Sequence, residues 1–72
     1  MCKTDAMRAA REAARWLLLV EPTISWEQFV EQVVAAVCNA RTPKNVARAA
    51  RRAAERVYAA RHYREHPEAA YR

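Results

Sequence analysis

The sequence contains no glycine, and only three prolines and two cysteines in 72 residues. Without glycine, the chain lacks the Cβ-free loops that bring a backbone close to a phosphate group. Tight β-hairpins are also disfavoured, because their turns need residues that accept positive φ. The two cysteines are too few for a disulfide framework and are typical of a reducing, cytoplasmic location.

Large aliphatic residues are scarce. Hydrophobic residues make up 53% of the chain, yet 17 of them are alanine, whereas three are leucine and one is isoleucine. The longest run of large apolar residues, Trp16 to Val20, is five residues long. This run is too short for a signal-peptide core or a membrane span. We therefore expect one helical domain over residues 1–72, with a thin core and no membrane partner.

Acidic residues are few in the second half of the chain. Residues 1–40 hold four basic and five acidic side chains, whereas residues 41–72 hold nine basic and three acidic ones. The net charge of +5 therefore arises entirely from the last 32 residues. Such asymmetry favours an acidic partner, either a protein surface or a nucleic acid. The alternative is an arginine-rich helix face that only meets water.

Apolar residues recur with helical spacing in three segments and predict α-helices at about residues 5–20, 26–39 and 43–65. We expect Thr4 to cap the first helix, which must end before Pro22. Its predicted buried face consists of Ala6, Met7, Ala10, Ala13, Ala14, Leu17 and Val20.

The second helix has the clearest start. Ser25 and Gln28 have the spacing of a capping box, and Ile24 and Phe29 that of a hydrophobic staple. Its predicted buried face consists of Trp26, Phe29, Val30, Val33, Val34 and Val37.

The turn before the third helix is predicted from local residue preferences. Asn39 or Ala40 is expected to close the second helix, and Asn39 is favoured because asparagine tolerates the left-handed conformation better. Thr42 and Pro43 are expected as the N-cap and first residue of the third helix. Its predicted buried face consists of Val46, Ala50, Ala53, Val57 and Ala60, flanked by Ala49 and Ala54.

Both connections are short, so consecutive helices should be antiparallel, and the fold class is all-α, a small up-down-up three-helix bundle. Most aromatic rings then gather at the end where the first two helices join. The third helix is the longest and overhangs, and residues 67–72 form a frayed tail or a short extra turn. Trp16 and Leu19 lie outside the stripe of the first helix, so either this overhang covers them or a partner does.

The chain offers little for catalysis or metal binding. His62 and His66 are four residues apart and could face one ion, but a zinc site needs at least three protein ligands. Cys38 is expected to have no histidine within reach and to be a small buried residue. We therefore predict a protein that is not an enzyme and that needs neither a metal nor another cofactor.

The sequence favours a small regulator or inhibitor that binds a partner protein, of the kind that phages and mobile elements encode. Trp, Tyr and Arg dominate interface hot spots, and burial in a homodimer would enlarge the thin core. The predicted partner-binding residues are Trp16, Leu19, Tyr58 and Tyr63 as apolar anchors, with Arg48, Arg51 and Arg52 facing an acidic surface.

The alternative is a DNA- or RNA-binding protein that resembles a helix-turn-helix reader in the order of its elements, with the third helix as the reading helix. The residues that would contact nucleic acid are Lys44, Asn45, Arg48, Arg51 and Arg52. Against it, Glu55 lies on the same helix face, where it would repel phosphate.

Overall fold

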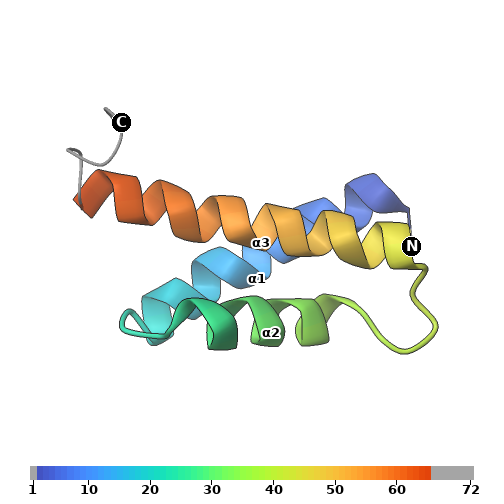
Figure 1. Cartoon of the computed structure of the whole chain (residues 1–72), viewed down its shortest axis with the longest axis horizontal. Helices are drawn as coiled ribbons and strands as arrows, with labels where there is room; N and C mark the ends of the chain where they lie inside the picture. Colours follow the sequence, from blue (N-terminus) through green and yellow to red (C-terminus); the bar gives the residue numbers. More distant parts are fainter. Residues whose placement is uncertain (1, 66–72) are drawn as a thin grey trace.

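The computed structural model describes residues 2–65, which form three α-helices: α1 (Lys3–Val20), α2 (Trp26–Val37) and α3 (Lys44–Glu65) (Figure 1). The chain runs along α1, returns along α2 and runs forward again along α3, so α1 and α3 point the same way. Each helix packs against the other two, and α1 and α3 share the most extensive contact. The predicted up-down-up three-helix bundle is confirmed. Residues 67–72, expected as a tail or an extra turn, lie outside the described residues.

The start of α2 follows from local chemistry. The Ser25 hydroxyl accepts a hydrogen bond from the Gln28 backbone N–H at 3.3 Å, which satisfies an otherwise free amide in the first turn. Ile24 and Phe29, on either side of this cap, are both buried in the core. The predicted N-terminal boundary of this helix is confirmed.

The start of α1 differs from the prediction. The helix begins at Lys3, and Cys2 occupies the N-cap position with no hydrogen bond from its side chain. Thr4 is therefore an exposed residue of the first turn and not the cap. Water can satisfy the free amides of an exposed helix start, and Asp5 in the first turn is favourably placed for the helix dipole.

The turn between α2 and α3 corrects two further predictions. Asn39 does not adopt the left-handed conformation, since no residue in the described range 2–65 has positive φ. Its Oδ1 instead accepts a hydrogen bond from the Arg41 N–H at 2.8 Å, and its own N–H donates to the Thr42 hydroxyl at 2.9 Å. Thr42 is thus bonded to the turn and does not cap α3. The Pro43 carbonyl takes the cap position and accepts from the Ala47 N–H at 3.0 Å.

The core joins an alanine seam to an aromatic end. The seam consists of Ala6, Ala10 and Ala14 of α1 and Ala49, Ala50, Ala53 and Ala54 of α3, all buried. At the aromatic end, the Tyr58 ring lies 5.1 Å from that of Phe29 and 5.2 Å from that of Trp26. The Tyr58 hydroxyl donates to the Ile24 carbonyl at 3.2 Å and so ties α3 to the first loop.

Three positions on the predicted buried faces are exposed, and one position outside those faces is buried. The exposed positions are Val20, Trp26 and Ala60, with Trp26 only 38% exposed, and the buried one is Leu18. The last buried positions of α1 are Leu17 and Leu18, and Val20 turns outward. Ala60 lies along an open hollow between α1 and α3.

The alanine seam leads to a prediction about Ala50, which has no exposed surface. Replacing it with leucine should lower the free energy of unfolding by about 1–3 kcal/mol, because added methylenes force two closely packed helices apart. Urea denaturation measures the change, and Ala36→Leu on the exposed side of α2 is the matched control. Equal midpoints for the two variants would contradict a close-packed seam.

Candidate binding surfaces

The last two turns of α1 carry an exposed apolar patch, formed by Trp16, Leu19 and Val20. Their side chains are 63%, 80% and 51% exposed. The spacing i, i+3, i+4 places the three on one face of the helix. The overhang of α3, which was one of the two predicted covers, leaves the patch open within residues 2–65. Residues 67–72, which follow the overhang, lie outside the described residues.

Arginines border this apolar patch on the α3 side. Leu19 shares a surface hollow with Arg15, Arg61 and Arg64. The Arg61 guanidinium donates from Nη1 to the Leu18 carbonyl at 3.0 Å, and its Nε pairs with Glu65, also at 3.0 Å. Arg61 therefore satisfies a free carbonyl at the end of α1, where the helix dipole favours a cation. Arg15 and Arg64 remain exposed beside the patch.

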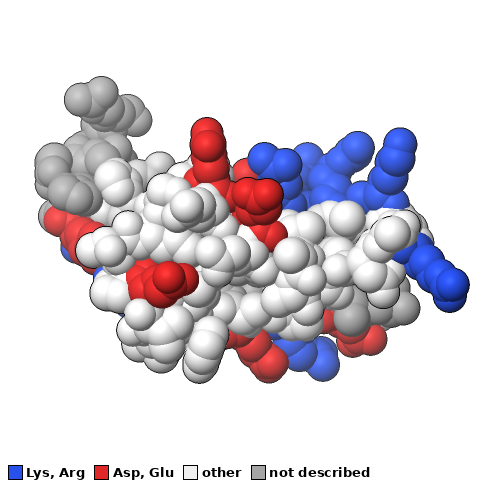
Figure 2. Space-filling view, turned by 90° about the horizontal axis from the view of Figure 1, so that it is seen from below, with Lys and Arg blue, Asp and Glu red and all other residues white. Residues whose placement is uncertain are grey.

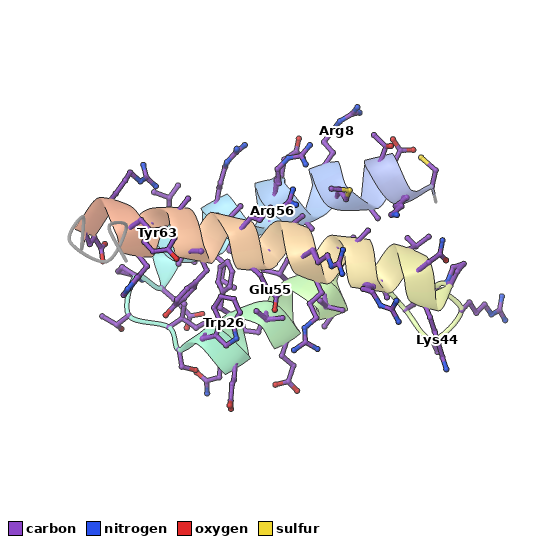
Figure 3. The ribbon with its side chains drawn as sticks, turned by 45° about the horizontal axis from the view of Figure 1, so that its top comes forward. Arg8, Trp26, Lys44, Glu55, Arg56 and Tyr63 are labelled. Atoms are coloured by element: carbon purple, nitrogen blue, oxygen red, sulfur yellow. The ribbon has the colours of Figure 1, made fainter. Side chains whose placement is uncertain are left out.

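The two tyrosines of the predicted partner-binding set differ in placement. Tyr58 is half-buried, and its ring and hydroxyl are both engaged inside the bundle. Tyr63 is 50% exposed on α3, with its ring centroid 5.9 Å from that of His62 (Figure 3). Tyr58 is thus primarily a packing residue, and only Tyr63 offers a free aromatic surface.

Arg48, Arg51 and Arg52 are exposed on the first half of α3, where Lys44 and Asn45 are exposed as well. Arg48 lies 13 residues before Arg61, which corresponds to about 20 Å along the helix. The predicted partner-binding residues therefore divide between two separate regions and do not form one surface.

The side of α3 that faces α2 carries mixed charge. Arg48 and Arg51 line a hollow together with Glu27 and Glu31 of α2, and Arg51 is paired with Glu55 at 3.7 Å. Figure 2, seen from the α2 side, shows basic side chains gathered where α3 begins, with carboxylates next to them. This mixture makes the α2-facing side of α3 a poor surface for a polyanion.

The side of α3 that faces α1 differs in its charge, and the sequence alone did not indicate this. Two adjoining hollows of about 350 and 390 Å³ lie between α1 and α3 and share Met7 and Arg56. We call the two together the basic groove. Its cationic lining consists of Lys3, Arg11 and Arg15 from α1 and Arg48, Arg52, Arg56 and Arg64 from α3. In the part of the chain that the structure describes, no carboxylate lines either hollow.

Other chemistry is sparse among residues 2–65. No three His, Cys, Asp or Glu side chains in this range come close enough together to hold a metal ion. His66, the second member of the histidine pair in the sequence, lies outside it. Cys2 and Cys38 are free thiols, exposed and half-buried respectively. Within the same range, no helix combines the length and apolarity needed to span a bilayer.

Compared with models of protein families, with curated proteins and with solved structures, the chain matches none of them. The apolar patch and the basic groove are the two surface features of residues 2–65 whose chemistry bears on function.

Proposed function

We propose that this chain is a non-enzymatic, cytoplasmic binding protein that regulates or inhibits a partner protein by docking through the apolar patch. The observation that supports the proposal is the exposure of Trp16, Leu19 and Val20 on one helix face. Burying a large apolar side chain stabilises a complex by roughly 1.5–3 kcal/mol. A protein with so few large apolar residues gains little from placing three of them in water unless a partner covers them.

The border of the patch suggests the chemistry of the partner. Arg15 and Arg64 flank Leu19, so a matching surface would present an apolar socket with carboxylates at its edge. A second copy of this chain fits less well, because a two-fold dimer would bring arginines of like charge together. We therefore assign the patch to a different protein and treat the homodimer as the competing hypothesis.

The test compares Leu19→Asp with Gln32→Asp, which adds the same charge at an exposed position on α2. Tagged wild-type protein and the Gln32→Asp variant should retain the same protein from a host lysate in stoichiometric amount, and Leu19→Asp should lose it. Both variants should keep wild-type stability within about 0.5 kcal/mol, because both sites are on the surface. Circular dichroism melting curves check that point.

Two results would contradict the proposal. One is equal capture by all three proteins. The other is a wild-type dimer in sedimentation velocity that Leu19→Asp converts to monomer, since this would assign the patch to self-association.

A further inference from the structure

We propose that the basic groove between α1 and α3 binds the phosphate backbone of a double-stranded nucleic acid. The groove meets the border of the apolar patch at Arg15 and Arg64 and extends away from it along α3. Its cations are separated by multiples of four residues, no carboxylate among residues 2–65 lines it, and its floor carries small or flexible side chains. The ligand differs from that of the proposed function, and Arg52 and Arg56 line the groove but not the hollow beside Leu19.

The cations of the groove follow a regular spacing on both helices. Arg48, Arg52, Arg56 and Arg64 of α3 are separated by four or eight residues. The same holds on α1 for Lys3, Arg11 and Arg15. Each step of four residues advances about 6 Å along a helix. Two rows of charges spaced in multiples of about 6 Å suit a ligand whose own charges repeat at a regular interval, as the phosphates of a nucleic acid strand do.

The groove cations are available to a ligand. Within residues 2–65, the arginine ion pairs are those of Arg51 with Glu55 and of Arg61 with Glu65, and neither arginine lines the groove. Arg56 lies in the channel between α1 and α3, whereas Glu55, the preceding residue, points to the α2 side (Figure 3). The Glu55 carboxylate is thus kept on the α2 flank of the helix, away from the groove.

The floor of the groove favours a duplex over other polyanions. It is formed by small or flexible residues such as Met7, Ala49 and Ala53, and none of the aromatic rings that the structure describes lines it. Single-strand binders stack bases on aromatic side chains, and peptides dock through apolar anchors in pockets. A duplex needs neither, because its phosphates are already on the outside. The predicted contacts are made to the phosphate charges and carry no specificity for base sequence.

The location also changes the role of α3. The alternative from the sequence was a reading helix that contacts nucleic acid through Lys44, Asn45, Arg48, Arg51 and Arg52. Such a helix would have to turn Arg51 away from Glu55 and the carboxylates of α2. In the groove, Arg48 and Arg52 act together with Arg56 and with α1, and Arg51 is not needed.

The experiment measures binding of a short DNA duplex by fluorescence anisotropy at several salt concentrations. The test variant is Arg52→Gln/Arg56→Gln. The control is Arg8→Gln/Arg41→Gln, which has the same net charge, is exposed at both positions and lies outside the groove. Arg8 points away from α3 (Figure 3).

Wild-type affinity should fall with salt with a log–log slope of about −0.9 for each phosphate contact. Loss of two contacts should reduce the slope by about 1.8, which corresponds to an affinity about 60-fold weaker at 0.1 M salt. The control should keep the wild-type slope. Arg52→Lys/Arg56→Lys should also keep it, because a phosphate contact needs the charge more than the guanidinium shape.

Several results would overturn the inference. These are absence of wild-type binding at low salt, equal weakening of the test and control variants, and tighter binding of a single strand with the same number of phosphates. Competition by polyglutamate as effective as that by duplex would assign the groove to an acidic protein instead. Circular dichroism melting curves for every variant confirm that the losses concern binding and not folding.

Discussion

Replacing Val33 by aspartate is expected to unfold the protein at room temperature. Val33 is only 1% exposed, in the middle of α2, and belongs to the single core cluster. An unpaired carboxylate at this place costs several kcal/mol, whether it stays charged or takes up a proton. A domain of 72 residues has a total stability of about 4–11 kcal/mol. An alanine-rich core belongs at the lower end of that range, so the substitution removes most or all of the stability.

Gln32→Asp is the matched control, because it puts the same carboxylate one residue earlier, on the exposed side of α2. Its free energy of unfolding should stay within about 0.5 kcal/mol of wild type. Far-UV circular dichroism and thermal melting distinguish the two variants. If Val33→Asp melted like Gln32→Asp, the buried face of α2 assigned here would be wrong.

α2 was the helix whose start was best predicted from the sequence, for a physical reason. The Ser25 cap is a bond between groups three residues apart, and the apolar spacing that follows repeats every turn. Neither signal depends on how the rest of the chain is arranged. Local chemistry is sufficient at such a position, and the predicted start was correct.

The turn between α2 and α3 shows where local chemistry is insufficient. Asn39 and Thr42 both have side chains that can cap a helix or close a turn. Which of the two they do depends on the path of the chain between two packed helices. In the structure the Thr42 hydroxyl bonds to the Asn39 N–H and to the Asn39 side chain. Asn39 therefore does not adopt the left-handed conformation, and the Thr42 hydroxyl does not cap α3.

The binding surfaces were partly predictable. Trp16 and Leu19 did not fit the stripe of the first helix, which correctly identified them as candidates for exposure. Tyr58 is half-buried, and its hydroxyl bonds to a carbonyl 34 residues away, which only tertiary packing shows. The sequence alone does not tell which of these exposed residues contact a partner.

The basic groove could not be predicted from one helix at a time. The first 40 residues have more acidic than basic side chains, so the net charge of this segment does not reveal that its cations contribute to a basic surface. Once α1 packs on α3, Arg11 and Arg15 line the same groove as Arg56, while Asp5 and Glu12 do not line it. The four-residue spacing of the arginines was a visible signal, but its meaning required the relative rotation of two helices.

The alanine seam links this surface to the fold. Small side chains let two helices approach closely, which brings the long arginines on their flanks within reach of one ligand. The same choice of residues makes the seam a weak source of hydrophobic stabilisation, because burying alanine contributes much less than burying a large side chain. The aromatic end must therefore supply a disproportionate share of the stability.

Phe29→Ala is expected to test that inference with an effect nearly as large as that of Val33→Asp. Phe29 has no exposed surface, and its ring packs against that of Tyr58. Truncating a buried phenylalanine to alanine costs about 3–5 kcal/mol, from lost burial and from the cavity left behind. Urea denaturation should show a much lower midpoint with little change in slope. Met7→Ala at the opposite end, where the side chain is half-buried, should cost at most about half as much. Comparable losses for the two variants would mean that stability is distributed evenly along the seam and is not concentrated at the aromatic end.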